Sequence, residues 1–568
     1  MRPDGYSRPY PNLAKFLLLG SCLLWGAGCV RDFGAGGTGE TVVPRRTLRE
    51  VETLDLERLS VPVTPTTEPS TRPATVRLAS TRPTGGPADA PSEVSLTLAD
   101  VRRIALENNL DLKVELLNPS IARTSLTEEQ ARYEALFTTN ASYSKTDSPT
   151  ATQLEGSQAN SLNVDPGLEI PLRTGGRLRF GLPVNRFETN NQFSTLNPAF
   201  SSDAAVTLSQ PLLRGFGFFV NAQPIRVAFY QYQSAQARTK LQVIRVLTDV
   251  EREYWRLYAV RQALAVRVQE YELAVAQLER ARRRERIGAG AEPDVIRAES
   301  GVADRVDAII GAENVVRDEE RLFKRLLNHP DLDVGSPTIV NTATEPTAMP
   351  YRLDPHSLAR AALDGRMELL EEELRIAQET ANVRVARNDL LPLVSLEYTY
   401  NIGGLGPTLD DSLSQVREKR FEDHRVGVRL EVPIGNEAAR SRLERAILSR
   451  LQRLATRDQR ELQIRQEVYD AVDELDANWQ RILAARRRVI AAARVVDLET
   501  RQNERGLRTS TDVLDAQANL ASAKLSEIQA VANYQIAQVD IAFATGTVLG
   551  ASKVVWQPTV APDRATRN

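Results

Sequence analysis

Two aspartates three residues apart stand at a helix start near the C-terminal end of the chain. The stretch reads TSTDVLDAQANLASAK and runs from Thr509 to Lys524. The hydroxyl residues before Asp512 can cap a helix, and Asp512 stands where the helix dipole favours a negative charge. Asp515 follows about one turn later on nearly the same face, and capping does not require it. Carboxylates that gather around one axis repel one another, attract cations and select solutes by charge.

A related helix start occurs about 220 residues earlier, where AEPDVIRAESGVAD carries Asp294. Each start follows a very long charged helix, and other segments recur in the same order. VRRIALENNLDL begins at Val101, and LARAALDGRMEL begins at Leu358. These matches predict an internal two-fold repeat, and the spacing of the matched segments gives the first copy about 33 extra residues between its strands.

The helices that lead to these starts are predicted to be unusually long. No proline interrupts the chain from about Pro224 to Arg286, and a second run extends from about Asn436 to Arg505. Apolar residues recur at 3-4 spacing along both, with Arg261 and Arg486 each interrupting the seam. A period near 3.5 predicts left-handed coiled-coil packing. Shorter helices are expected over 98–136 and 294–328.

Alternating segments predict strands in both copies. In copy two, apolar and polar residues alternate over 394–402 and again over 426–432. Each run is about nine residues long, which is close to a tilted strand that crosses a bilayer, although a hairpin on a soluble sheet has the same pattern. Copy one alternates more weakly over 137–143 and 204–208. Between these, LEIPLRTGGRLRFGLPV predicts an extra hairpin that turns at Thr174–Gly176.

Composition and motifs exclude several classes of function. A net charge of −2 over 568 residues argues against a nucleic-acid partner. The histidines, His329, His356 and His424, are far apart, and both cysteines lie in the first thirty residues, so the body of the chain offers no Cys/His zinc site or disulfide framework. The sequence contains no nucleophile elbow, P-loop or HExxH motif. We therefore expect no enzyme activity, no metal and no cofactor.

The N-terminus is predicted to be an export signal. An uncharged run of 13 residues, FLLLGSCLLWGAG, follows Lys15; it is too short to cross a bilayer and suits a signal peptide. The run leads into GAGC, which resembles the lipobox of bacterial lipoproteins, so Cys29 is the expected acylated residue. LGSC at Cys22 fits the short consensus but leaves a short apolar stretch before it, and a plain secretory signal is a further alternative.

The order of these parts resembles the TolC-like outer-membrane efflux proteins over about 96–550. The most specific match is RTSTDVLDAQANLASAK from Arg508. The resemblance implies an α+β membrane protein: a homotrimer with a 12-stranded outer-membrane β-barrel, four strands per chain, continuous with a long periplasmic coiled-coil barrel of helices. It implies an exit duct for a tripartite efflux or type I secretion system, which passes substrates from an inner-membrane pump of RND or ABC type and a periplasmic adaptor to the exterior. The alternative is a periplasmic coiled-coil adaptor or scaffold without a pore.

The same resemblance implies site residues at the periplasmic tip. Asp512 and Asp515 would form constriction rings, and Arg508 would bridge to Asp294. The best-known family member has a threonine where this chain has Pro293 and a tyrosine where it has Asn503, so a thinner closing network is expected. The small residues of the tips are expected to dock the adaptor; they are Gly288, Ala289, Gly290 and Gly506.

The predicted organisation has six parts. A lipoprotein signal peptide spans 1–28 and a disordered tether spans 29–92. Repeat 1 occupies 93–330, a linker 331–352 and repeat 2 353–550, and a flexible tail ends the chain over 551–568. The expected location is the outer membrane, lipid-anchored and inserted through the barrel, with the helices in the periplasm.

Overall fold

The computed structural model describes residues 92–150, 156–288 and 290–555. The predicted signal peptide, Cys29 and nearly all of the predicted tether lie outside the described residues, as do Ala289 and most of the predicted C-terminal tail. The statements below concern the described residues.

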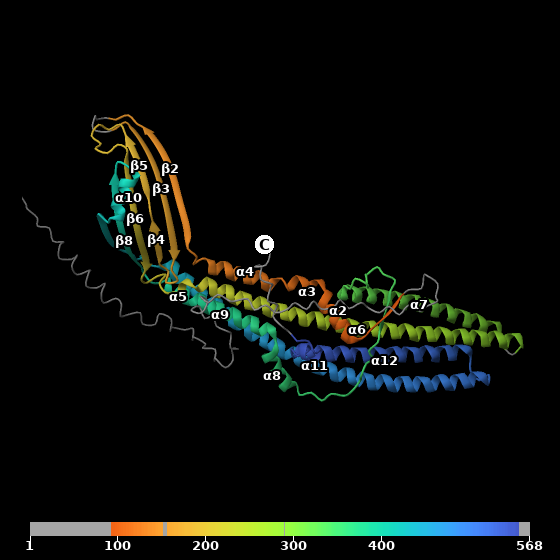
Figure 1. Cartoon of the computed structure of the whole chain (residues 1–568). Coiled ribbons are helices and arrows are strands. Elements are labelled where there is room, and N and C mark those ends of the chain that lie inside the picture. Colours follow the sequence, from red (N-terminus) through yellow and green to blue (C-terminus); the bar gives the residue numbers. More distant parts are fainter. Residues whose placement is uncertain (1–91, 151–155, 289, 556–568) are drawn as a thin grey trace, which may run out of the picture. The chain divides into compact units, whose positions relative to one another are not determined.

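Two long helical hairpins hold the longest elements of the described chain (Figure 1). Helix α6 (Gln223–Arg286) has 64 residues and packs against α7 (Glu292–Leu327), while α11 (Glu437–Glu504) has 68 residues and packs against α12 (Ser510–Ala544). These bounds confirm the predicted lengths to within two residues or so. No helix in the described part of the chain is long and apolar enough to span a membrane.

The first helix of each copy is broken. A single helix was expected over 98–136, but the chain forms α2 (Leu98–Asn108), α3 (Leu110–Glu115) and α4 (Asn118–Ala131). The break at Asn109 is stabilised because its side chain caps α3, accepting from Leu112 N at 3.0 Å, and donates to Leu326 O at 2.9 Å. In copy two the break falls between α8 (Pro355–Gly365) and α9 (Met367–Asn388), at Arg366, which is the position that the repeat matches to Asn109.

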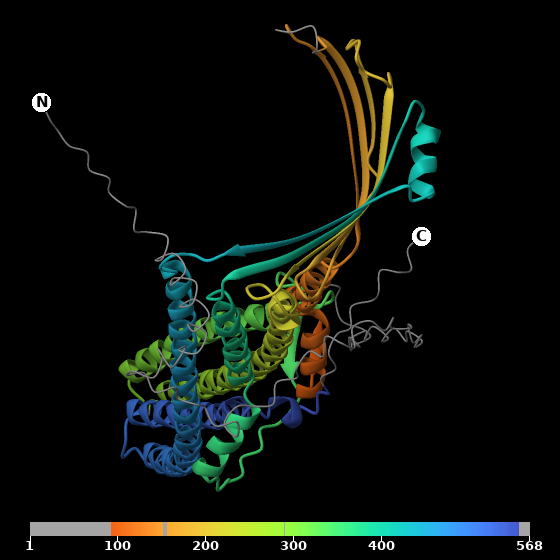
Figure 2. The ribbon, with the colours of Figure 1, turned by 90° about the vertical axis from the view of Figure 1, so that its left-hand side faces the viewer.

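One antiparallel sheet joins strands from both copies (Figure 2). Its order is β2 (Leu136–Asp147), β3 (Gln158–Pro171), β4 (Arg177–Gly181), β6 (Ala199–Pro211), β8 (Leu393–Gly406) and β9 (Phe421–Glu431), and β5 (Val184–Thr189) also lies between β3 and β6. The predicted strands of both copies are confirmed, and so is the extra hairpin. The expectation of four sheet strands per chain was wrong, because the strands of the extra hairpin are part of the same sheet.

Short elements complete the chain. They are α5 (Phe218–Asn221), α10 (Leu409–Arg417), α13 (Val548–Ala551) and a parallel pair of strands, β1 (Glu93–Leu96) and β7 (Ile339–Thr342). Strand β7 lies inside the segment 331–352 that was expected to be a linker. Helix α10 packs closely on β8 at two glycines. A Cβ atom at Gly404 would collide with the backbone of Ser412, and a Cβ atom at Gly406 would collide with the Cβ atom of Asp411.

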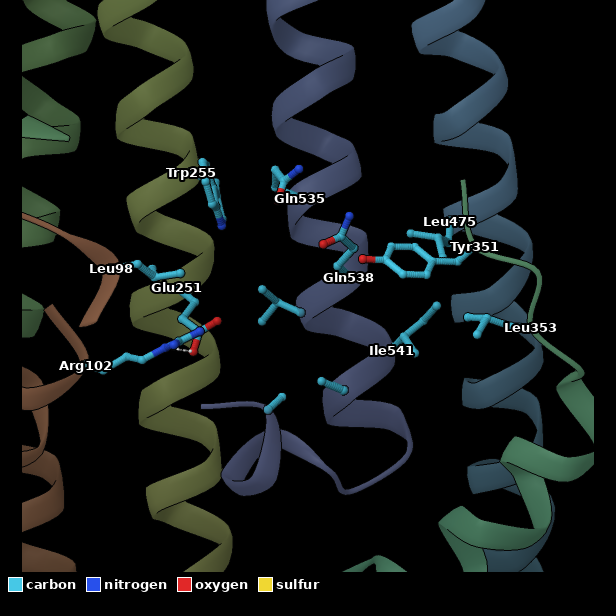
Figure 3. Close-up of a pocket in the computed structure, with 13 residues that line it drawn as sticks. Leu98, Arg102, Glu251, Trp255, Tyr351, Leu353, Leu475, Gln535, Gln538 and Ile541 are labelled. Carbon is cyan, nitrogen blue, oxygen red and sulfur yellow. Dashed lines mark hydrogen bonds and ion pairs between the residues drawn. The ribbon is translucent and has the colours of Figure 1, made fainter. Parts of the chain in front are cut away.

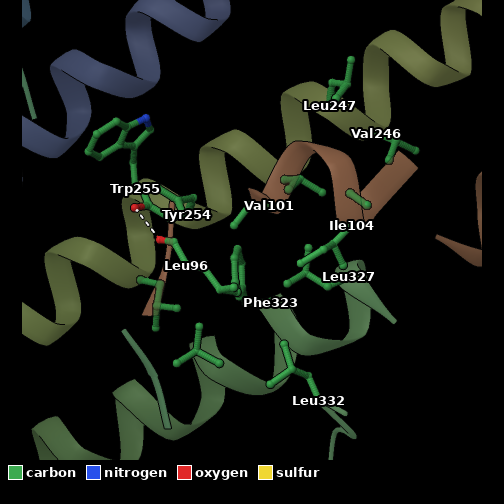
Figure 4. Packing of buried hydrophobic residues seen from close by; sticks show 14 of the residues in the cluster. Leu96, Val101, Ile104, Val246, Leu247, Tyr254, Trp255, Phe323, Leu327 and Leu332 are labelled. Carbon is green, nitrogen blue, oxygen red and sulfur yellow. Dashed lines mark hydrogen bonds between the residues drawn. The ribbon is translucent and has the colours of Figure 1, made fainter. Parts of the chain in front are cut away.

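The largest apolar core lies where β1 and β7 meet α2, α6 and α7 (Figure 4). Tyr254 and Phe323 are fully buried in it. The Tyr254 hydroxyl donates to Leu96 O at 3.2 Å and accepts from Thr344 N at 2.8 Å. This one side chain therefore ties α6 to both chain segments that flank the small sheet.

The predicted coiled-coil seam holds for only part of α6. Leu247, Val250, Tyr254 and Leu257 follow the predicted 3-4 spacing and are buried, but Val268, which continues this spacing, is 39% exposed. Beyond Arg261 the buried set moves to another face of the helix and consists of Val266, Glu270, Ala274, Gln277 and Ala281. Both α7 and α12 pack against α6, and Gln277 on this face bonds to Ser510 at the start of α12.

Candidate functional site

Each long hairpin turns at a glycine in the left-handed backbone region. Gly288 has φ 73° and Gly506 has φ 76°, a conformation that residues with a Cβ rarely adopt. Gly288, Gly290 and Gly506 are exposed, and a Cβ at Gly288 or Gly506 would meet no atom within 4 Å. These residues and the helix ends beside them are called the tips from here on.

Asp512 forms a capping box with Thr509 at the second tip. The Asp512 carboxylate accepts from Thr509 N at 2.9 Å, and the Thr509 hydroxyl caps Asp512 N. The backbone hydrogen bond from Thr509, followed by its hydroxyl, lowers the pKa of Asp512 below its usual value. Asp512 therefore stays charged at neutral pH and rigidly placed, as the sequence pattern indicated. Asp515, one turn on, is exposed.

Arg508 and Asp294 each have another partner within the chain. Arg508 Nε lies 3.3 Å from Glu499 Oε2 and donates to Gln502 Oε1 at 3.2 Å. Asp294 lies 3.6 Å from Arg297 Nη1 on its own helix. The bridge between Arg508 and Asp294 is thus not among the ion pairs of the described chain.

The two tips are joined instead through Asn503, which sequence reasoning treated as a lost contact. Arg284 Nη1, from the last turns of α6, donates to Asn503 O at 3.3 Å and to Asn503 Oδ1 at 3.4 Å. The Asn503 amide in turn donates to Arg508 O at 2.9 Å. Below the turns, Gln277 donates to the buried Ser510 hydroxyl at 3.3 Å. The run RARRRER contains Arg284, but nothing in that run distinguishes it from its neighbours.

Replacing Arg284 by alanine is expected to loosen the tips. The lost hydrogen bonds are worth about 1 kcal/mol, so tip amides should exchange with solvent several-fold faster in a hydrogen-exchange measurement. Arg283→Ala is the matched control, because Arg283 pairs with Glu279 on its own helix at 3.5 Å. Equal exchange in the two variants would show that Arg284 does not join the tips.

The sheet has one apolar face that crosses all of its strands. Residues directly opposite each other in an antiparallel pair point to the same side. One such row runs Phe137, Leu168, Phe180, Val206 and Tyr400 across β2, β3, β4, β6 and β8. Further apolar residues of this side are Tyr143, Leu162, Val164, Leu178, Val184, Leu208, Leu396, Tyr398, Ile402, Val426, Val428 and Leu430. Many of them are exposed, Val426 by 68% and Phe137 by 66%.

The other face of the sheet is polar. Its neighbouring row runs Glu169, Arg179, Thr207, Thr399 and Arg425. Arg179 also pairs with Asp165 on β3 at 3.0 Å. A sheet with exposed apolar residues on one face and charges on the other suits a wall between hydrocarbon and water.

A hollow of about 340 Å³ lies between α6, α12 and α11 (Figure 3). Trp255, Leu475 and Ile541 line it, with the amides of Gln535 and Gln538. Its one carboxylate, Glu251, is paired with Arg102 at 2.6 Å and also accepts from Ser552 at 2.9 Å. Both contacts are made by Glu251 Oε1, so this oxygen is held within the chain.

An acidic pair lies buried between α6 and α7. Glu253 is 4% exposed, and burial, followed by its hydrogen bond to Glu319, raises its pKa to about 7. Arg256, 3.3 Å away, opposes this shift. Glu253 Oε1 and Glu319 Oε2 are both buried, and neither has a hydrogen-bond partner that is recorded among the described residues, so a proton that Glu253 keeps can satisfy both.

This pair predicts a stability that falls as the pH rises. The folded pKa of Glu253 lies above its ordinary value of 4.5, so the fold keeps a proton that the unfolded chain releases. Stability should therefore fall between about pH 4.5 and 7, by on the order of 1–3 kcal/mol. Glu253→Gln should remove most of this dependence and raise the thermal midpoint at pH 8, while Glu279→Gln, at an exposed site on α6, should not. A pH profile unchanged by Glu253→Gln would contradict the shared proton.

The fold, with its long helical hairpins and two-faced sheet, is that of a class of solved proteins, the outer-membrane channels. Solved structures of this class are similar to the chain. The outer-membrane channel OprN matches with a TM-score of 0.59 and 20% identity, over 79% of this chain and 90% of that one. CusC matches with a TM-score of 0.60 and 16% identity, over 79% of this chain and 92% of CusC. CmeC of Campylobacter jejuni matches with a TM-score of 0.59 and 15% identity, over 79% of this chain and 85% of CmeC. At these identities the likeness shows the fold.

Sequence comparison finds a family match over part of the chain. Residues 358–547 match the family model described as "Outer membrane efflux protein". The outer membrane efflux protein BepC of Brucella suis is 25% identical over 315 residues, which make up 54% of this chain and 65% of BepC, just under two thirds of its length. The chain is therefore similar in sequence to outer membrane efflux proteins over part of its length, and similar in fold to outer-membrane channels over most of it.

Proposed function

We propose that this protein is the exit duct of a tripartite efflux or type I secretion system. Three copies form the duct, and substrates pass through it from an inner-membrane pump of RND or ABC type and a periplasmic adaptor to the exterior. The observation that carries the proposal is the sheet, whose exposed apolar face crosses every strand while the opposite face holds charges. A barrel wall needs both faces, because lipid lies outside it and water inside.

The unpaired edges of the sheet support assembly of several copies into one barrel. Strands β2 and β9 each have one strand partner in the described chain. In hydrocarbon an unpaired strand edge leaves backbone groups without hydrogen bonds, which costs several kcal/mol per group. Copies of the chain that close a ring satisfy both edges. The helical hairpins then hang from the ring into the periplasm.

The duct closes at the tips. Asp512 and Asp515 of three copies surround the axis there, and the six carboxylates attract cations and repel one another. Arg508 and Asp294 have partners within their own chain; on assembly they exchange these for a bridge between tips. Opening pulls the hairpins apart against the hydrogen bonds from Arg284 to Asn503.

The periplasmic adaptor docks on the small residues of the tips, Gly288, Ala289, Gly290 and Gly506. These residues have small side chains or none, so the helical hairpins of an adaptor approach the backbone closely at these positions, beside the exposed Ile287 and Leu507. A lipid on Cys29 anchors the other end of the chain to the outer membrane.

A pore-less adaptor or scaffold is the rival function. A long coiled coil alone suits either protein, but a scaffold has no use for an exposed apolar sheet face of this extent, which would aggregate in water. The sheet therefore favours the duct.

Two measurements test the proposal together. The purified protein should run as a trimer on gels without heating and as a monomer after heating. Single cysteines at Ala289 or Gly506 should crosslink to the adaptor in cells, whereas a cysteine at Asp497, higher on α11, should not. A heat-insensitive monomer would contradict the shared barrel, and tips that give no crosslinks would contradict docking there.

A further inference from the structure

The extra hairpin of the first copy is a full member of the sheet. Strand β3 pairs with β2 over the entire length of β2, from Leu136 opposite Glu169 to Asp147 opposite Gln158. On its other side β3 pairs with β4 and β5, and both of these pair with β6. Strands β2 and β6, which form the one hairpin that the first copy needs for four strands per chain, are thus separated by two further strand positions.

Strands β4 and β5 form one strand position. Gly181 is opposite Gly167 and Val184 is opposite Val164, so the register with β3 does not change across the gap. The register with β6 is also unbroken, since Gly181 is opposite Ala205 and Val184 is opposite Ser202. The gap falls at Leu182 and Pro183, and the proline has no N–H to donate to a neighbouring strand. Leu182 N still bonds to Pro166 O at 3.0 Å. The sheet therefore has six strand positions per chain.

The added strands carry the same two faces as the rest of the sheet. Leu168 and Phe180 continue the apolar row between Phe137 and Val206. On the other side, Arg177 lies 3.5 Å from Glu169, and Arg179 lies 3.0 Å from Asp165. A hairpin that plugs a pore or folds in the periplasm has no reason to keep its apolar residues in line with those of the wall strands. The alignment places the hairpin in the wall.

The two edge strands of this six-position sheet, β2 and β9, run in directions that allow antiparallel pairing between copies. Every neighbouring pair in the sheet is antiparallel, so β2 and β9, five steps apart, run in opposite directions. An even number of positions lets β9 of one copy pair antiparallel with β2 of the next without a parallel contact. All residues of β2, and all but one of β9, are exposed within the chain.

We propose that three chains close a barrel of eighteen strand positions, six from each chain, rather than the twelve that the family resemblance implies. The partner at each edge is a second copy of this chain, and the proposal rests on the proposed duct. With strands about 4.8 Å apart and tilted by about 40°, eighteen positions give a ring roughly 36 Å across, against roughly 24 Å for twelve. The hairpin also adds the charges of Asp165, Glu169, Arg177 and Arg179 to the inner wall.

Single-cysteine labelling of the hairpin tests the wider barrel. Phe180→Cys and Arg179→Cys are neighbours on opposite faces, and Val206→Cys and Thr207→Cys are the matched pair on β6. The chain's own cysteines, Cys22 and Cys29, lie far from all four in sequence. Each variant is prepared as a full-length protein in membranes, and only variants that form the heat-sensitive trimer are compared.

We expect position 180 to behave like 206 and position 179 like 207. A fluorophore attached to the Phe180→Cys variant should be quenched by brominated lipid. The Arg179→Cys variant should react at least tenfold faster than the Phe180→Cys variant with a water-soluble maleimide. Fast aqueous labelling at both 179 and 180 in intact trimers would overturn the eighteen-position barrel and leave the proposed duct standing. A wild-type protein that forms no trimer would contradict both.

Discussion

Asparagine in place of both Asp512 and Asp515 is expected to abolish most of the cation preference of the duct. The double variant removes six carboxylates from the narrowest ring of the proposed trimer, where the charges lie close together and water is limited, so their field on a passing ion is strong. The ratio of cation to anion permeability, measured from reversal potentials across a planar bilayer in a salt gradient, should fall several-fold toward one. Resting conductance should rise or fall little by comparison, because asparagine keeps the size of the side chain.

The substitution is chosen to separate charge from folding. Asn Oδ1 at position 512 can still accept from Thr509 N, the bond that Asp512 makes at 2.9 Å, so the helix start remains capped. Asp497→Asn is the control, because Asp497 is exposed near the end of α11 and pairs with Arg501 on its own helix at 3.0 Å. Selectivity that changes equally in the control and the double variant would refute the axial position of Asp512 and Asp515.

Alanine in place of Tyr254 is expected to destabilise the protein by about 3–5 kcal/mol. The ring is fully buried, packs edge-on against Trp255 with centroids 5.3 Å apart, and also contacts Phe323. Its hydroxyl bonds to Leu96 and Thr344, so phenylalanine at this position should cost about 1 kcal/mol by leaving Thr344 N unpaired, while Leu96 O keeps its bond from Ala343 N. Denaturant titration of the detergent-solubilised protein measures both losses.

Tyr258→Ala is the comparison for Tyr254→Ala. Tyr258 lies one turn further along α6 and is only partly buried at the edge of the same core. Its truncation should cost clearly less than that of Tyr254. Equal losses at the two positions would mean that the junction of α6 with the small sheet is not the main support of this region.

The sequence predicts the long elements well because their signals are local. The bounds of α6 and α11 follow from uninterrupted helix-forming residues. Period-2 alternation locates β8 and β9, although β8 continues to Gly406 and β9 begins at Phe421, before the alternation does. The break at Asn109 was missed, because its cause is tertiary: the side chain bonds to Leu326, 217 residues away. The shift of the buried face of α6 beyond Arg261 was missed for a similar reason, since two other helices pack there.

The tip was predictable in part. Thr509 and Asp512 form a cap that any reader of local sequence expects, and the left-handed Gly288 and Gly506 follow from their place after long helices. The contact from Arg284 to Asn503 was not predictable, because it joins two turns that are 219 residues apart. The predicted number of strands was wrong because the sequence of a strand does not determine which strands pair with it. The extra hairpin was found from its own alternation, but its position between β2 and β6 depends on pairing between strands that are distant in sequence.

Single-channel recording of the purified wild-type trimer in a planar bilayer tests the central claim most directly. The proposed duct predicts stable, cation-selective conductance steps from protein that runs as a heat-sensitive trimer, with a different response to voltage of either sign because the tips lie on one side. Purified trimer that inserts into the bilayer and conducts no ions, including after disruption of the tips by Arg284→Ala together with Asp512→Asn and Asp515→Asn, would contradict the duct.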